Sequence, residues 1–246
     1  MKLENSFVEF FKKLSCLLLI NLVLMLSFST AVRADQTGIE NYREARNIFW
    51  ESLYEDGATS LYCGAFEKDR SGDINVEHVY PASWMKPAAG CEDQSRKNCR
   101  RNSERFNVME GDLHNLYPAL KNVNTARGNL TFTIIPGMEN RLAVAAAPSC
   151  DFEKVNSTVE PPVTSRGEIA RAIFYMNDEY GAEIGKNGKE EPELVELLTE
   201  WHCSDSVSTE EKRRNDAIEV LQGNRNRFID KPDLIACPVA LKFPID

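Results

Sequence analysis

Six cysteines behind an apolar leader constrain the fold of this chain more than any other feature of its sequence. Lysines precede an apolar run that is uncharged up to Arg33 and closes on the cleavage pattern Val32–Ala34, which is typical of a secretory signal peptide over residues 1–34. An uncleaved membrane anchor is the alternative, because the run is nearly long enough to span a bilayer. We expect cleavage after Ala34, which leaves residues 35–246 as a periplasmic or secreted protein.

An exported chain with an even number of cysteines is expected to use them in disulfides. Six cysteines permit 15 pairings, and Cys91 and Cys99 close a loop so short that we expect these two to pair. A zinc site is disfavoured because no C-x-x-C spacing occurs and a single cysteine, Cys203, neighbours a histidine. We therefore expect three structural bridges from Cys63, Cys91, Cys99, Cys150, Cys203 and Cys237.

The mature chain is predicted to form one domain, because no linker, internal repeat or low-complexity tract interrupts residues 35–246. Apolar spacing and capping residues predict helices over 41–57, 115–128, 165–181, 192–203 and 208–223. Strand-like runs cover 74–81 and 129–136. Helices around a few strands indicate an α+β fold.

The charge of the chain is uneven. A formal net charge of −9 at pH 7 argues against binding polyanions through bulk charge. The stretch Ser95–Arg105, however, has five basic residues against one acidic residue. It is either a solvated loop or a patch that contacts phosphates. In the second interpretation the residues that bind nucleic acid are Arg96, Lys97, Arg100 and Arg101.

An adjacent acid and imidazole, Glu77 and His78, end the first strand-like run just before Pro81. An acid in a packed strand is costly to bury without a partner. If the strand ends at a site, both side chains can flank one bound phosphate. His114 and His202 are interpreted as structural, the first in a hydrogen-bonded turn and the second as a partly buried helical residue.

Asn124 is a second polar residue in an unexpected place, since asparagine is a poor interior helix residue. It follows Leu120 by four residues, so it lies beside the inward stripe of the helix predicted over 115–128. Its amide oxygen could bind a hard cation or cap a loop. One carboxylate and one amide oxygen, completed by water, suit Mg²⁺ better than Zn²⁺.

Six short motifs, in this order, resemble the bacterial secreted or periplasmic endonuclease I family, a branch of the ββα-metal (His-Me finger) nucleases: VEHVYPA, SRKNC, MEGDLHNLYPA, NVNTARGN, RGEIARAIFYM and QGNRN. The resemblance covers nearly all of the mature chain and implies a mostly helical domain around a ββα-metal core. It implies that His78 is the general base and that Glu77 and Asn124 are the protein ligands of one divalent cation. It also implies that Arg96 holds the phosphate. The implied cofactor is Mg²⁺, with Mn²⁺ or Ca²⁺ as substitutes.

The expected function is that of an exported, sequence-nonspecific endonuclease, acting on DNA and also on RNA, that leaves 5′-phosphate and 3′-hydroxyl ends. Contacts to backbone phosphates carry no base information. We expect a monomer that is not inserted in a membrane after signal cleavage. The alternative is a secreted nucleic-acid-binding protein without turnover, which explains the basic stretch but not Glu77, His78 and Asn124 together. A metallopeptidase is disfavoured because H-E-x-x-H is absent from the sequence.

Overall fold

Two antiparallel strands and the helix that follows them form the centre of the fold. The computed structural model describes residues 38–68, 73–137, 141–142 and 147–238. Strand β3 (Ile74–His78) pairs with β4 (Leu116–Leu120), and α6 (Lys121–Arg127) begins directly after β4. The register places His78 opposite Leu116. This order of elements is consistent with the ββα core predicted from the sequence.

Residues 116–120 form β4 and are not helical, so the prediction of one helix over 115–128 was wrong in its first half. A short apolar run fits a buried strand as well as a helix by periodicity, and here pairing with β3 decides the outcome. Proline lacks a backbone N–H, so Pro118 leaves no donor without a partner in β4. Its carbonyl accepts a hydrogen bond from the Leu61 N–H at 2.8 Å.

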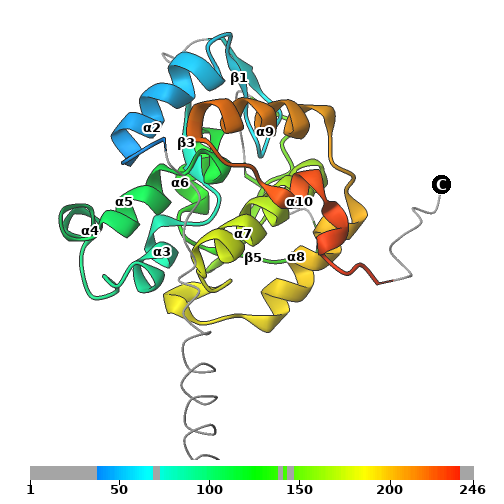
Figure 1. Ribbon diagram of the computed structural model, residues 1–246. Coiled ribbons are helices and arrows are strands. Elements are labelled where there is room, and N and C mark those ends of the chain that lie inside the picture. The colour runs from blue at the N-terminus through cyan, green and yellow to red at the C-terminus, as the bar shows by residue number, and fades with distance from the viewer. Residues whose placement is uncertain (1–37, 69–72, 138–140, 143–146, 239–246) are drawn as a thin grey trace, which may run out of the picture. The chain divides into compact units, whose positions relative to one another are not determined.

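The other helices surround this centre (Figure 1). They are α2 (Tyr42–Ile48), continued by a π-helical segment (Phe49–Leu53), and α3 (Ala82–Ala88), α4 (Arg96–Asn102), α5 (Glu104–Gly111), α7 (Arg166–Tyr180), α8 (Pro192–Ser204), α9 (Thr209–Gln222) and α10 (Arg227–Asp230). Short 3₁₀ turns cover Leu113–Asn115, Val163–Ser165, Lys186–Gly188 and Pro232–Leu234. The helices predicted around α2, α7, α8 and α9 are thus confirmed, as is the α+β class.

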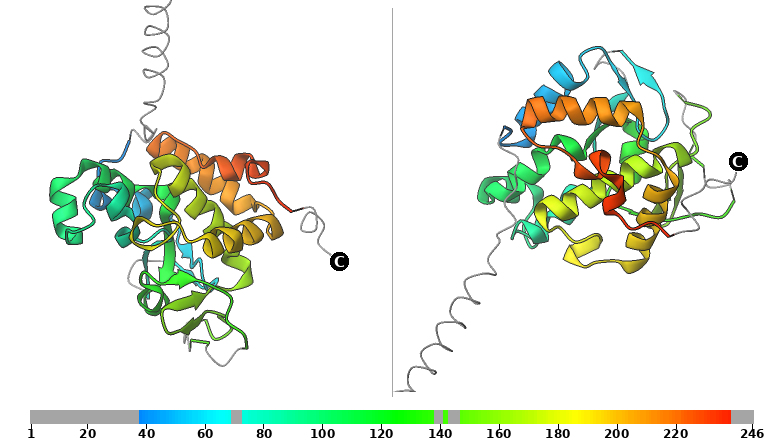
Figure 2. Two further views of the ribbon diagram at one scale, coloured as in Figure 1. Left: turned by 90° about the horizontal axis from the view of Figure 1, so that it is seen from below. Right: turned by 45° about the vertical axis from the view of Figure 1, so that its right-hand side comes forward.

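The remaining strands are short. Strands β1 (Ala58–Thr59) and β2 (Phe66–Glu67) pair with each other. A second small sheet has the order β5–β7–β6, from β5 (Thr131–Phe132), β6 (Glu153–Val155) and β7 (Thr158–Glu160). It lies below the helices in the left view of Figure 2. The strand predicted over 129–136 is therefore limited to two residues.

Helix α7 supplies the largest part of the core. Its Ile169, Ile173 and Met176 have no exposed surface. The side chain of Asp205, the residue after α8, lies so close to α7 that a Cβ at position 167 would overlap its carboxylate. This close approach requires glycine at position 167. Burial of these side chains contributes about 1.5–3 kcal/mol each, and α8 and α10 pack on α7.

Three disulfides join Cys63 to Cys150, Cys91 to Cys99, and Cys203 to Cys237. The three expected bridges, including Cys91–Cys99, are therefore present. The first bridge ties the turn between β1 and β2 to the segment before β6, with its Cα atoms 4.7 Å apart.

The described residues, from 38 to 238 with their gaps, belong to one compact unit. The predicted signal peptide and its cleavage position lie outside the described residues. Within the part of the chain that the structure describes, none of the helices combines the length and the apolar composition needed to cross a membrane.

His114 is a structural residue, as predicted, but its side chain does not bond within its own turn. Its Nε2 lies 3.2 Å from the carbonyl oxygen of Asn224, and its Nδ1 is buried without a hydrogen-bond partner. The ring packs against Tyr175 with ring centroids 4.6 Å apart. Burial disfavours the charged ring and lowers the pKa of His114 to about 4.

We expect the free energy of unfolding to fall as the pH drops from 6.5 toward 4, because the unfolded chain then binds a proton that folded His114 excludes. A folded pKa of about 4, against about 6.5 in the unfolded chain, corresponds to a loss of about 2 kcal/mol between pH 7.5 and pH 5. Denaturant unfolding at both pH values should show a smaller loss for His114→Gln than for wild type. Equal losses would contradict the assignment.

Candidate active site

A cleft of about 680 Å³ is lined by residues from α2, β3, α3, α4 and α6. Four residues singled out from the sequence as catalytic or metal-binding line it together: Glu77, His78, Arg96 and Asn124. Arg100 joins them, whereas Lys97 and Arg101 do not line the cleft. Segments far apart in the sequence thus meet at one place, although the roles assigned to these residues remain predictions.

His78 is the last residue of β3, and 9% of its surface is exposed. Its Nε2 lies 3.0 Å from the carbonyl oxygen of Glu110. Because a carbonyl can only accept, Nε2 carries the hydrogen and Nδ1 is the unprotonated nitrogen. Burial, followed by the positive charge of Arg96, lowers the pKa of His78 to about 4. At neutral pH the ring is therefore uncharged and can accept a proton at Nδ1.

The Glu77 carboxylate is almost completely buried, with 2% of the residue exposed. The Tyr62 hydroxyl donates a hydrogen bond to Oε1 at 2.7 Å, and Nε of Arg127 lies 3.4 Å from the same oxygen. Neither contact uses Oε2. Burial raises the pKa of Glu77 to about 7, while the charge of Arg127 and the Tyr62 hydrogen bond act in the opposite direction.

Asn124, in α6, is held against β3 by its amide nitrogen. Nδ2 donates to Oδ1 of Asn75 at 2.9 Å and to the carbonyl oxygen of Val76 at 3.1 Å. The Val76 carbonyl can only accept, which fixes which end of the amide is nitrogen. The amide oxygen is therefore the atom left to act as a ligand, and Asn124 does not use its side chain to cap a loop.

The donor set fits a hard divalent cation. Glu77 and Asn124 contribute oxygen atoms from neighbouring elements that line one cleft, and oxygen ligands are those that Mg²⁺, Mn²⁺ and Ca²⁺ prefer. Within the described residues no group of three or more His, Cys, Asp or Glu side chains could hold a metal ion.

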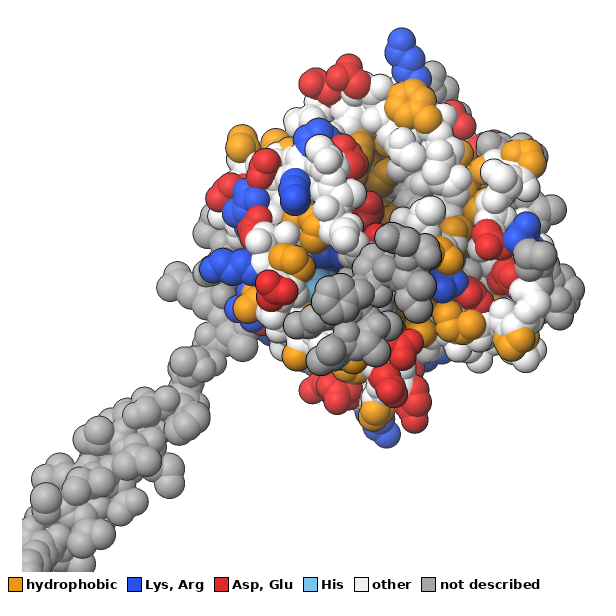
Figure 3. All heavy atoms as spheres, turned by 90° about the vertical axis from the view of Figure 1, so that its right-hand side faces the viewer, with side chains coloured by type: hydrophobic (Ala, Val, Ile, Leu, Met, Phe, Trp, Pro, Cys, Tyr) orange, Lys and Arg blue, Asp and Glu red, His pale blue; other side chains and the backbone are white. Residues whose placement is uncertain are grey.

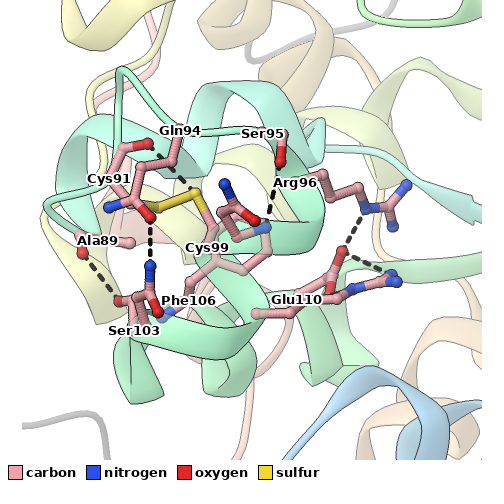
Figure 4. The surroundings of a disulfide bond; sticks show 12 residues. Ala89, Cys91, Gln94, Ser95, Arg96, Cys99, Ser103, Phe106 and Glu110 are labelled. Atoms are coloured by element: carbon pink, nitrogen blue, oxygen red, sulfur yellow. Dashed lines mark hydrogen bonds and ion pairs between the residues drawn. A yellow bond between two sulfur atoms is a disulfide. The ribbon is translucent and has the colours of Figure 1, made fainter.

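Helix α4 divides its basic residues between two faces. Arg96 and Arg100, one turn apart, both bind the buried Glu110 of α5; Arg100 Nε lies 2.5 Å from Oε2, and Arg96 Nε binds Oε1. Figure 4 shows Arg96 and Glu110 directed toward each other, to one side of the Cys91–Cys99 bridge. Lys97 and Arg101 are exposed.

The stretch Ser95–Arg105, for which a solvated loop was one of the two interpretations, is helical over most of its length. Ser95 caps α4 by accepting a hydrogen bond from the Asn98 N–H. Arg105 does not belong to the basic surface formed by the other four residues, because its guanidinium donates to the carbonyls of Ala88 and Tyr180. Its role is structural.

Sequence reasoning missed four residues that hold the site together: Asn75, Tyr62, Arg127 and Glu110. Glu110 contributes its carbonyl to His78 and its carboxylate to Arg96 and Arg100. It lies inside the motif MEGDLHNLYPA, but a single sequence offers no pattern that distinguishes it from a surface acid. Asn75 and Arg127 stand next to recognised motif residues, and Tyr62 stands beside Cys63.

Positive charge is local on this acidic protein. On the face drawn in Figure 3, acidic side chains lie at the top, on both sides and along the lower part, with Lys and Arg side chains scattered among them. A polyanion would therefore depend on the local charge of α4 and on Lys86 of α3, which lines the cleft.

Comparison with known proteins finds similarity along most of the chain. A family model described as Endonuclease I matches residues 26–233. An extracellular deoxyribonuclease of Aeromonas hydrophila is 33% identical over 236 residues, which cover 87% of this chain and 97% of that protein. A periplasmic deoxyribonuclease of the same species is 32% identical, covering 87% and 94%. An extracellular ribonuclease of Bacillus subtilis (strain 168) is 30% identical over 227 residues, covering 85% and 67%.

We expect Glu110→Gln to lower the free energy of unfolding by about 2 kcal/mol, because two guanidinium groups lose a fully buried charged partner. The matched control is Glu210→Gln, which removes an exposed ion pair with Arg213 and should change stability by less than about 0.5 kcal/mol. Denaturant unfolding measures both. Equal effects would show that the buried charge of Glu110 contributes no more to stability than an exposed ion pair does.

Proposed function

The chain belongs to the endonuclease I family, and on that premise we propose that it is an exported endonuclease that cleaves DNA and RNA with one Mg²⁺ ion. Family membership makes it a phosphodiester hydrolase. One observation carries the finer proposal: the neutral imidazole of His78, the oxygens of Glu77 and Asn124, and the guanidinium of Arg96 line the same cleft.

The choice of substrates rests on the relatives and on the chemistry of α4. Two relatives are named deoxyribonucleases and one a ribonuclease, and their names place them outside the cell or in the periplasm. The three disulfides suit the same oxidising compartments. Arginines that contact phosphates hold either polymer without reading its bases, so we propose cleavage without sequence preference.

In the proposed reaction, a water molecule attacks phosphorus while Nδ1 of His78 accepts its proton. The new phosphorus–oxygen bond forms as the bond to the 3′ oxygen breaks, and that oxygen leaves with a proton from solvent. The products end in a 5′-phosphate and a 3′-hydroxyl. The carbonyl of Glu110 keeps the ring oriented throughout, because it remains bound to Nε2 whether Nδ1 is protonated or not.

Arg96 is suited to hold the phosphate. Its contact with Glu110 is made through Nε, so the two terminal nitrogens of the guanidinium are not used in that contact. These nitrogens can bind phosphate oxygens in a fork. Mg²⁺, held by Glu77 and Asn124, would neutralise the negative charge that develops on the phosphate.

A secreted nucleic-acid-binding protein without turnover remains the second candidate. It would use the exposed Lys97 and Arg101 equally well. A binding protein, however, gives no reason for the arrangement of His78, whose Nε2 donates to a carbonyl and whose Nδ1 carries no proton. Nor does it explain why Glu77 and Asn124 line the same cleft. The endonuclease is therefore favoured.

We expect His78→Ala to reduce cleavage of supercoiled plasmid by about 10² to 10⁴-fold, the usual contribution of a general base. Binding of DNA, followed by gel shift, should persist because α4 is unchanged. The matched control is His202→Ala: His202 lies outside this cleft, with its Nε2 2.9 Å from the carbonyl of Pro232. Wild-type cleavage by His78→Ala would end the assignment of His78 as base.

Removal of divalent cations with EDTA should abolish cleavage, and Mg²⁺ or Mn²⁺ should restore it, because the proposed oxygen ligands select hard cations. The assay is plasmid nicking, repeated with single-stranded DNA and RNA. Cutting that persists in EDTA would refute the metal-dependent reaction. Binding without cutting under all metal conditions would favour the second candidate.

A further inference from the structure

We propose that Tyr62 and Arg127 are positioning residues that orient the Glu77 carboxylate, so that Oε1 is held within the protein and Oε2 is presented to the cation. This inference rests on the proposed function, because it takes Glu77 to be a metal ligand. Neither Tyr62 nor Arg127 lines the cleft, and both would act through Glu77.

The geometry at Glu77 carries the proposal. Tyr62 is 1% exposed, and its hydroxyl donates to Oε1 at 2.7 Å. Arg127 is completely buried, and its Nε approaches the same oxygen at 3.4 Å. The hydrogen bond from Tyr62 and the ion pair with Arg127, whose Nε makes no hydrogen bond, both act on Oε1 and so restrict the rotation of the carboxylate. Partners that orient a ligand in this way commonly matter to metal affinity as much as the ligand's own type.

Tyr62 is itself fixed from several directions. Its neighbour Cys63 is bonded to Cys150, and its ring packs on that of Phe152, with centroids 5.1 Å apart. The adjacent Leu61 is tied to β4 through the carbonyl of Pro118. The Tyr62 hydroxyl therefore approaches Glu77 from a turn that the Cys63–Cys150 disulfide holds in place.

Arg127 is also fixed before it meets Glu77. Its Nη2 donates to the carbonyl of Val79 at 2.8 Å, and its Nη1 donates to the carbonyl of Gly128 at 3.0 Å. Its guanidinium lies over the ring of Phe132, 4.6 Å from the centroid. These contacts place Nε 3.4 Å from Oε1 of Glu77, in an ion pair without a hydrogen bond, and the positive charge of Arg127 offsets the buried negative charge.

The two residues are not equivalent toward a cation. The positive charge of Arg127 repels Mg²⁺ while its geometry helps to orient the ligand, so substitution of Arg127 has opposing effects. Tyr62 is neutral and contributes geometry without such repulsion. The cleanest test is therefore Tyr62→Phe, which removes one oxygen atom and keeps the ring packed on Phe152.

The experiment measures Mn²⁺ binding to the purified, oxidised mature protein by isothermal titration calorimetry, without nucleic acid. We expect Tyr62→Phe to raise the dissociation constant for Mn²⁺ by about 10-fold or more, within the 10–100-fold range usual for such partners. In cleavage assays the Mg²⁺ concentration for half-maximal rate should rise by a similar factor, while the rate at saturating Mg²⁺ should stay much closer to wild type.

The matched control is Tyr180→Phe. Tyr180 is also buried and also donates to a buried carboxylate, Oδ2 of Asp112, at 2.6 Å. Asp112 does not line the cleft, so this variant should bind Mn²⁺ with the wild-type dissociation constant. It therefore reports any general effect of removing a buried phenol hydroxyl.

Two further variants make the result decisive. Arg127→Lys keeps the charge but removes the fixed Nε contact, and it should also raise the dissociation constant; it replaces Tyr62→Phe if thermal melting shows that the latter is unfolded. Glu77→Gln should abolish binding. Wild-type affinity in both folded positioning variants, with binding lost in Glu77→Gln, would overturn this inference and leave the metal site standing. Wild-type affinity in Glu77→Gln would instead overturn the proposed metal site.

Discussion

The buried carboxylate of Glu77 is the constraint around which the centre of this protein is arranged. An acid removed from water must find partners or lose its charge. Three segments meet to provide them: β3 carries the acid, the end of α6 brings Arg127, and the stapled turn before β2 brings Tyr62. Burial still outweighs these partners, since the pKa of Glu77 is raised to about 7. A bound cation would supply the missing positive charge.

Glu110 holds three residues of the cleft in place, and its backbone and its side chain do so differently. Its backbone carbonyl fixes the tautomer of His78, and its carboxylate draws Arg96 and Arg100 to the same place. A single residue therefore sets the spacing between the proposed base and the proposed phosphate-binding group. Neither side chain would keep its position if the end of α5 moved.

The sequence predicted the residues of the cleft better than the elements that carry them. Short polar motifs identified Glu77, His78 and Asn124, because acids, imidazoles and amides are unusual in packed segments. The apolar run Leu116–Leu120 was assigned to a helix, since only its pairing with β3 decides its conformation. Supporting residues such as Tyr62 escaped notice because a buried tyrosine in a sequence resembles any other core residue.

The turn that carries Tyr62 lies outside the two strands and helix that hold the proposed ligands. Its attachment depends on a covalent link between positions 87 residues apart in the chain. A protein engineer who transplanted β3, β4 and α6 alone into a new scaffold would therefore carry over the ligands without the group that aims one of them. A transplanted version of this site must also include the segments joined by the Cys63–Cys150 disulfide, which are far apart in the sequence.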